Sequence, residues 1–308
     1  MNKYLKNAAS IFIVVFILSS GGFSQELNPL FTAKKIKNYL PHMTWKEVEM
    51  ALQKTDMVII PVGSIEQHGK HLPLCTDICG VIEECKLIAQ KADVLIAPVL
   101  WVGISEHHMG FPGTMTISPE TFEAVVFESA VSLIRHGFKK IMIYNGHGGN
   151  NTAVNNVLHR LNHKTEATAV SLNALEPPGE ESGVLPEIDW HAGVGETSWM
   201  LYVANSLVDM SKAEKPVLTF PPAIQKVMEK AREDPNMESI AWATLFTPKN
   251  IGKKASTREM TNNGVMSSGD PGDARSELGR KGVQRLVDAV VKFIEEWKKI
   301  DMIAMEEK

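Results

Sequence analysis

This 308-residue chain has few cysteines and no excess of basic residues, and each of these features excludes a class of protein. The three cysteines, Cys75, Cys79 and Cys85, crowd into one short stretch, unlike the dispersed, even set of a disulfide scaffold. The 32 basic residues are outnumbered by 36 acidic ones, so the chain offers no basic field that would attract nucleic acid. We therefore expect no nucleic-acid partner and a small-molecule substrate.

Long apolar runs are also missing. The run at residues 8–18 is too short to cross a bilayer comfortably as a permanent helix. It follows two lysines and precedes a Ser/Gly-rich segment, which is the three-part layout of a secretory signal. We expect residues 1–24 to be a signal peptide, an exported periplasmic or extracellular protein, and no membrane span after cleavage. An uncleaved anchor is the alternative.

No Pro/Ser/Gly-rich linker or block of like charge divides the remainder of the chain. With 44% hydrophobic and 22% charged residues, the chain can bury a large core. Residues 25–308 are therefore predicted to form a single domain.

Apolar runs of strand length alternate with segments of helical periodicity. This alternation predicts a mainly parallel sheet with helices on both faces. Residues 220–270, which contain Pro221, Pro222, Pro248 and the start of a Gly/Ser/Asn-rich stretch at 262–272, are expected to be irregular, as a lid or an oligomer contact. The predicted strands are 57–62, 94–97, 141–144 and 167–172, and the main predicted helices are 80–92, 119–136, 150–161 and 273–297.

Metal-ligating residue types follow two of these strands. Glu66, His68 and Asp77 lie in the segment after the first strand, and His147 follows the strand at 141–144. The carboxyl ends of parallel strands meet at one edge of the sheet, where ligands bind in open α/β folds. Carboxylate and imidazole ligands suit Zn²⁺, Mn²⁺ or Fe²⁺ better than Ca²⁺. The sequence therefore predicts a transition-metal site of one or two ions.

A further cluster surrounds the start of another helix. Glu196 is expected near the helix amino end, where buried carboxylates need a proton or a cation. His191 is the strongest candidate for proton transfer, because imidazole titrates near neutral pH. Glu106, His107 and His108 precede a Phe-Pro-Gly-Thr turn and are candidates to line the pocket, although surface loop positions are the alternative.

The turn Gly146-His147-Gly148-Gly149-Asn150 allows another interpretation, because a glycine-rich turn between strand and helix can bind phosphate. It lacks both the Walker lysine and the spacing of dinucleotide-binding loops, so we disfavour nucleotide binding. The amides of Gly148 and Gly149 are instead expected to stabilise negative charge in the substrate pocket.

Four segments in order resemble the signature blocks of the creatininase-like amidohydrolases: GSIEQHGKHLPLCTD (63–77), HHMGFPGTMTIS (107–118), NGHGGN (145–150) and HAGVGETS (191–198). The resemblance covers roughly residues 40–298. It implies a three-layer α/β/α sandwich, a hexamer of identical subunits and metal-dependent hydrolysis. It further implies that Glu66, Asp77 and His147 hold one metal, and that His68, a bridging Asp77 and Glu196 hold a second.

By the same resemblance, His191 matches the catalytic histidine. His108 and Trp190, the residue before His191, are expected to line the substrate pocket. Two positions depart from the creatinine-hydrolysing members. Gly149 stands where they have a glutamate ligand, and Trp190 stands where they have an acid. These departures argue against creatinine as the substrate.

Hydrolysis of a C–N bond in a small amide or cyclic amide, with catalysis by His191 and Glu196, is the leading functional hypothesis. Hydrolysis of an oxidised sugar, cyclitol or lactone-like substrate is the first alternative, because the same activated water attacks other carbonyls. A secreted metal- or ligand-binding protein without turnover is the second alternative. The spacing of Cys75 and Cys79 would also allow them to pair in an oxidising compartment.

Overall fold

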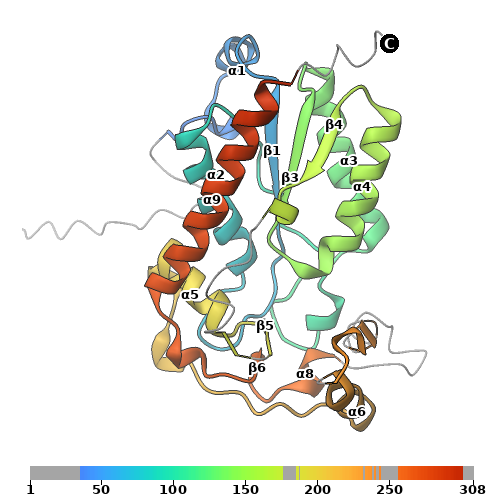
Figure 1. Ribbon diagram of the computed structural model, residues 1–308, viewed down its shortest axis with the longest axis vertical. Helices are drawn as coiled ribbons and strands as arrows, with labels where there is room; N and C mark the ends of the chain where they lie inside the picture. The colour runs from blue at the N-terminus through green and yellow to red at the C-terminus, as the bar shows by residue number, and fades with distance from the viewer. Residues whose placement is uncertain are drawn as a thin grey trace, which may run out of the picture.

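The computed structural model describes residues 35–175, 185–186, 188–231, 233–237, 239–240, 243 and 256–300. The predicted signal segment, residues 1–24, lies outside them. A four-stranded parallel sheet forms the centre of the described part (Figure 1), with strand order β2-β1-β3-β4. Its strands are β1 (Met57–Val62), β2 (Leu95–Ile96), β3 (Lys140–Asn145) and β4 (Thr168–Ser171).

The pairing of β1 with β3 positions the loops that follow them. Met57 pairs with Lys140, and the register runs without a shift to Val62 paired with Asn145. Both strands therefore end at the same level of the sheet, and the next residues, Gly63 and Gly146, leave it side by side.

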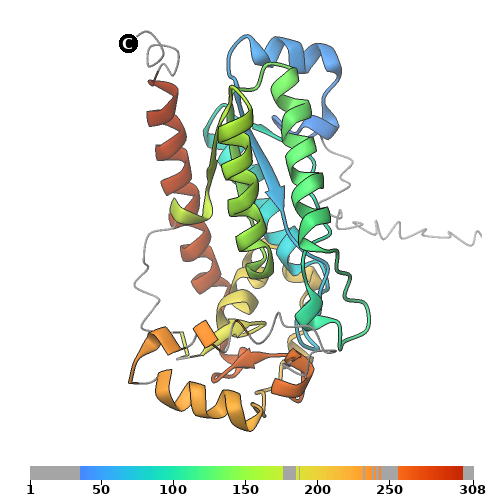
Figure 2. The ribbon, with the colours of Figure 1, turned by 90° about the vertical axis from the view of Figure 1, so that its right-hand side faces the viewer.

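Helices cover both faces of the sheet, which confirms the predicted α/β/α architecture. In Figure 2, α9 (Ser276–Lys298) lies on one side of the sheet and α3 (Pro119–Arg135) and α4 (Asn151–Lys164) lie on the other. α2 (Thr76–Lys91) packs on the same face as α9. The buried side chains of β1 alternate between these layers. Met57 and Ile59 pack in the α2/α9 layer, and Val58 and Ile60 pack in the α3/α4 layer.

α2 starts at Thr76, four residues before the predicted start near Gly80. Asp77 consequently lies in the first turn of a helix and not in a loop. Gly80 marks a close approach inside the helix, because a Cβ atom there would lie 1.8 Å from the ring of Trp199. The prediction was wrong because it treated this glycine as a helix boundary.

The remaining elements lie mainly at the end of the sheet where the strands finish (Figure 1). The expectation that residues 220–270 are irregular was wrong in part, because the helices Pro222–Ala231 and Thr257–Met260 and the strand Met266–Ser267 lie in that range. Pro222 occupies the first position of its helix, which proline favours. No helix among the described residues is long and apolar enough to span a membrane. The elements at the end where the strands finish are β5 (Asp189–His191), α5 (Val194–Val203), α6 (Pro222–Ala231), α8 (Thr257–Met260) and β6 (Met266–Ser267). α1 (Trp45–Leu52), which begins with a capping box at Thr44, lies at the opposite end.

Candidate metal centre

The predicted ligands converge at the carboxyl edge of the sheet from separate parts of the chain. Glu66 and His68 lie on the loop after β1, and His147 lies between β3 and α4. His191 ends β5, and Glu196 lies in the first turn of α5. Of the predicted ligands, Glu66, His68, Asp77 and His147 are buried, and Glu196 is partly exposed.

The side chain of Asn150 connects the loops that follow β1, β2 and β3 by hydrogen bonds. Its Nδ2 donates to the carbonyl oxygen of Gly63 at 3.1 Å and to Oδ1 of Asn145 at 3.1 Å. Its Oδ1 accepts from the backbone N–H of Ile104 at 2.9 Å. One fully buried side chain thus fixes the loops after β1, β2 and β3 relative to one another.

The carboxylate of Asp77 lies between two imidazoles. Its Oδ1 is 3.1 Å from Nε2 of His68, and its Oδ2 is 3.3 Å from Nδ1 of His147. Glu66 Oε2 approaches the same Nδ1 of His147 at 3.3 Å. Glu196 Oε2 lies 3.7 Å from Nε2 of His68. The donors therefore form two groups that share Asp77: Glu66, Asp77 and His147, and His68, Asp77 and Glu196.

Backbone carbonyls fix the tautomers of three histidines. His68 Nδ1 lies 3.1 Å from the carbonyl oxygen of Glu66, and His147 Nε2 lies 3.0 Å from that of Ile104. His191 Nε2 lies 2.6 Å from the carbonyl oxygen of Gln67. Because a carbonyl can only accept, each ring donates through that nitrogen. The other nitrogen of each ring faces carboxylate oxygens and needs a proton or a cation there.

The electrostatics of the centre reflect the same need for positive charge. Burial lowers the pKa of His68, but the carboxylates of Asp77, Glu196 and Glu66 outweigh burial and raise it to about 10. Burial raises the pKa of the Glu66 carboxyl, but the surrounding histidines, first His108 and His147, hold it well below its usual range.

These donors fit a bound transition metal. Asp77 Oδ2 is buried and has no hydrogen-bond partner among the described residues. Ligand atoms of Glu66, His68 and Asp77 all lie within 4.8 Å of one another, as do those of His68, His191 and Glu196. Histidines that donate one N–H to a backbone carbonyl and direct the other nitrogen at a common point are typical of metal sites.

His191 and Glu196 differ in their proton affinity. Burial and then the charge of His68 lower the pKa of His191 to about 3, so His191 is neutral at neutral pH with Nδ1 as its acceptor. Burial raises the pKa of Glu196 to about 7, although the N–H of Ala192 donates to its Oε2 at 2.6 Å. Ala192 has φ 51°, a left-handed conformation that costs about 1 kcal/mol or more in a non-glycine residue.

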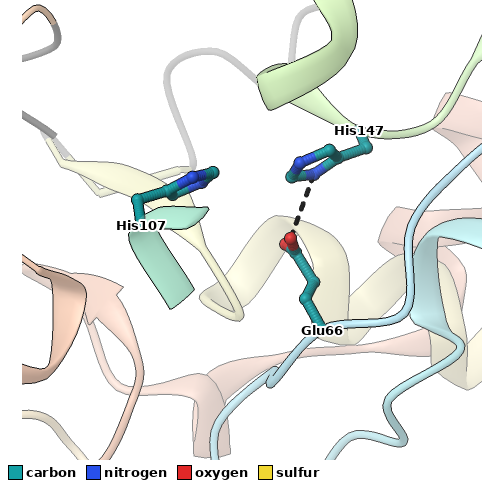
Figure 3. Close-up of side chains that lie close together, drawn as sticks. All are labelled: Glu66, His107 and His147. Atoms are coloured by element: carbon teal, nitrogen blue, oxygen red, sulfur yellow. Dashed lines mark ion pairs between the residues drawn. The ribbon is translucent and has the colours of Figure 1, made fainter. Parts of the chain in front are cut away.

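Three residues of the loop after β2 complete the surroundings of Glu66. Ser105 Oγ donates to Glu66 Oε2 at 2.6 Å, and His108 Nε2 lies 3.4 Å from Glu66 Oε1. His107 lies across from His147 (Figure 3), with ring centroids 5.7 Å apart and planes within 10°. His107, Glu66 and His147 also offer ligand atoms within 4.8 Å of one another. Sequence reasoning named both histidines as pocket candidates but missed Ser105, which no motif distinguishes from other serines.

A cavity of about 340 Å³ opens onto the centre. The predicted pocket residues His108, Gly148, Gly149 and Trp190 all line it, together with His191 and Glu196. Of the other residues predicted at the site, Glu106 is exposed and lines a neighbouring cavity instead. His68 is fully buried and does not line the cavity. The oxyanion role of the two glycine amides stays a prediction.

Gly149 lies against the hydrogen bond that orients His147. A Cβ atom at this position would lie 2.3 Å from the carbonyl oxygen of Ile104 and 2.4 Å from Nε2 of His147. This backbone therefore has no room for a glutamate at position 149. Gly148 is different, because a Cβ atom there would meet nothing within 4 Å.

Comparison with known proteins relates the chain to a family of hydrolases. The family model described as creatinine amidohydrolase matches residues 41–294. Creatinine amidohydrolase from Pseudomonas putida is 31% identical over 205 residues, covering 60% of this chain and 79% of that protein. The mycofactocin precursor peptide peptidase of Mycolicibacterium smegmatis is 35% identical over 158 residues, covering 48% of this chain and 58% of that protein. A 3-dehydro-scyllo-inosose hydrolase from Thermotoga maritima is 30% identical over 172 residues, covering 53% of this chain and 55% of that protein.

Solved structures share the fold. A putative creatinine amidohydrolase from Bacteroides fragilis superimposes with a TM-score of 0.66 at 24% identity, covering 87% of this chain and 99% of that one. A creatininase described as a manganese form gives a TM-score of 0.64 at 23% identity, covering 84% of this chain and 98% of that one. A creatininase variant described as a Zn–Zn type gives 0.65 at 24% identity, with the same coverage of both chains.

Proposed function

The chain belongs to the creatininase family, and we propose on that basis that it is a metal-dependent hydrolase that cleaves a C–N bond in a small amide or cyclic amide. The observation that carries the proposal is the fixed orientation of His68, His147 and His191. Each donates one N–H to a backbone carbonyl and directs its other nitrogen at carboxylate oxygens. Histidines oriented in this way are typical of sites that bind a cation, which would lie between the ring nitrogens and the carboxylate oxygens.

Zn²⁺, Mn²⁺ or Fe²⁺ is the proposed cofactor, with one or two ions per chain. Zinc and manganese forms of creatininases with the same fold support this choice. Glu66, Asp77 and His147 would hold one ion, and His68, Asp77 and Glu196 would hold a second. A bound ion of this kind lowers the pKa of a water molecule towards neutrality and polarises a carbonyl group.

His191 and Glu196 are the proposed proton carriers. Nδ1 of His191 is the unprotonated nitrogen, and it lies 3.6 Å from Glu66 Oε1 and 4.0 Å from Glu196 Oε2. His191 would accept a proton from the attacking water and donate it to the leaving nitrogen. Glu196 lines the same cavity and, when its site holds no ion and burial raises its pKa to about 7, it would pass that proton on to solvent.

The cavity supports a small substrate. Its volume of about 340 Å³ is at the small end of ligand pockets. Trp190 offers an apolar wall, and its ring packs against Phe220 at a centroid distance of 6.3 Å. The creatinine-hydrolysing members carry an acidic residue at each of positions 190 and 149. This chain has a tryptophan at position 190 and no room for a side chain at position 149, and both differences argue against creatinine as the substrate.

Hydrolysis of an oxidised cyclitol is the second candidate function. The observation that favours it is the similarity to the 3-dehydro-scyllo-inosose hydrolase. Parallel assays on cyclic amides and on oxidised cyclitols separate the two candidates, because the product amine appears in the first reaction alone.

Export and a hexameric assembly remain part of the proposal, and size-exclusion chromatography with light scattering measures the assembly.

The deciding experiment is elemental analysis of the purified protein together with Glu66→Ala and His147→Ala variants. We expect one or two transition-metal ions per chain, loss of metal in both variants, and loss of amide hydrolysis with it. His159→Ala is the matched control, because His159 is exposed on α4. Retention of metal and activity in His147→Ala would overturn the proposal. A protein that holds metal but hydrolyses no amide or cyclitol would favour the non-catalytic binding protein.

A further inference from the structure

Two cysteines flank the proposed bridging ligand on its own helix. Cys75 is the N-cap of α2 and Cys79 follows one turn later, so Asp77 lies midway between them. The two Sγ atoms are 2.9 Å apart, and the N–H of Cys79 donates to the carbonyl oxygen of Cys75 at 2.8 Å. The first hydrogen bond of the helix therefore holds the two thiols in contact.

We infer that Cys75 and Cys79 form a redox-active dithiol, which closes to a disulfide with a small disulfide oxidant and thereby changes metal binding through Asp77. The spacing permits closure. One helical turn separates the Cα atoms by about 6 Å, within the range that disulfides span, and the sulfurs must approach to roughly 2.05 Å.

The two thiols have different access to solvent, which sets the order of events. Cys75 is half-buried, whereas Cys79 is buried. Cys75 loses its proton and attacks one sulfur of the oxidant, whose S–S bond breaks and releases one thiol. Cys79 then loses its proton and attacks the mixed disulfide at Cys75, which releases the second thiol. Two protein thiols are oxidised, and one oxidant disulfide is reduced to two thiols.

Closure acts on the residue between the two sulfurs. Oδ1 and Oδ2 of Asp77 face His68 and His147 at 3.1 Å and 3.3 Å, so the carboxylate is constrained on both sides. Closure replaces two thiols that rotate independently by one bond of fixed length and torsion, which restrains the first turn of α2, where Asp77 lies. Metal-ligand distances tolerate changes of only about 0.2 Å. This coupling rests on the proposed metal site, whereas disulfide formation itself does not.

The test treats the metal-loaded protein with oxidised glutathione, alkylates the remaining thiols and measures the intact mass. Wild type should lose two reactive thiols and the mass of two hydrogen atoms, and dithiothreitol should reverse the change. Cys85→Ser is the matched control, because Cys85 is buried farther along the same helix and should leave the reaction intact. Cys79→Ser should form no intrachain disulfide. A stable glutathione adduct on wild-type Cys75, or no reaction at all, would overturn the dithiol.

Metal affinity, measured by competition with a chelator, tests the coupling to Asp77. We expect the oxidised protein to bind metal about ten- to a hundredfold more weakly, as when groups that orient ligands are altered. Equal affinity in both redox states would overturn the coupling. Absence of metal in both states would contradict the proposed hydrolase instead, and the thiol count would still decide whether the dithiol exists.

Discussion

Gly149 approaches the imidazole of His147 so closely that a Cβ atom on the glycine would lie 2.4 Å from Nε2. That nitrogen donates the hydrogen bond to Ile104 that directs Nδ1 at Glu66 and Asp77. A methyl group at position 149 must therefore displace either the ring or the acceptor.

Gly149→Ala should consequently weaken metal binding while Gly148→Ala does not. We expect affinity to fall by about ten- to a hundredfold in Gly149→Ala, which is the usual effect of disturbing a ligand's orientation. Gly148→Ala is the matched control because a Cβ atom there meets nothing within 4 Å. Competition with a chelator measures both variants, and equal affinities would show that the contact at Gly149 does not orient His147.

Asn150→Ala should destabilise the whole protein, because it removes the partners of Gly63, Asn145 and Ile104 in a buried position. We expect the free energy of unfolding to fall by about 2–5 kcal/mol, since each unsatisfied buried group costs roughly 1–3 kcal/mol. Asn156→Ala, which removes an exposed hydrogen bond to Glu123, is the control and should cost less than about 1 kcal/mol. Urea unfolding compares them, and similar losses would contradict the structural role of Asn150.

Metal removal should lower stability through the proposed ligands. A ligand present at a hundredfold excess over its dissociation constant adds about 2.7 kcal/mol to the free energy of unfolding. Chelation should therefore lower the melting temperature of wild type more than that of His147→Ala, which lacks a ligand of one proposed ion. An equal effect of chelator on both proteins would place the bound ion elsewhere.

Acidification should destabilise the protein through His71, which lies outside the proposed ligand set. Burial lowers the pKa of His71 to about 4, and its Nε2 lies 2.8 Å from Oγ1 of Thr197. In the unfolded chain a histidine titrates near pH 6.5. Between these values the unfolded state binds the additional proton, so stability is lost as the pH falls from about 6.5 to about 4.

His71→Gln isolates this contribution. The free energy of unfolding, measured in urea at several pH values, should decline less steeply below pH 6.5 in the variant than in wild type. Parallel curves for the two proteins would mean that His71 titrates alike in the folded and unfolded states.

The sequence predicts the sheet well because its strands are buried on both faces. The apolar run at 57–62 coincides with β1, and the predicted strand at 141–144 lies within β3. Convergence of Glu66 and His147 follows from the parallel register alone. Local patterns thus contain most of the information that positions these two residues.

Other features depend on contacts between distant segments. Nothing in the sequence distinguishes Ser105 and Asn150 from other polar residues, because their hydrogen bonds join loops that become adjacent only in the folded protein. Asp189 was not singled out, yet its carboxylate accepts from the N–H groups of Val194 and Gly195 and so caps α5. The start of α6 had a readable signal in Pro222, which we took to indicate irregular structure.

The carbonyl groups that orient the three histidines belong to the main chain, so side-chain replacement does not delete them. A substitution at Gln67 or Ile104 would change a buried side chain but would not remove the carbonyl oxygen that accepts from His191 or His147. The orientation of these rings therefore does not depend on the side chains of the residues whose carbonyl groups accept the hydrogen bonds. Gly149 is different, because the addition of a single carbon there intrudes on the hydrogen bond of His147, although the substitution deletes no group that takes part in it.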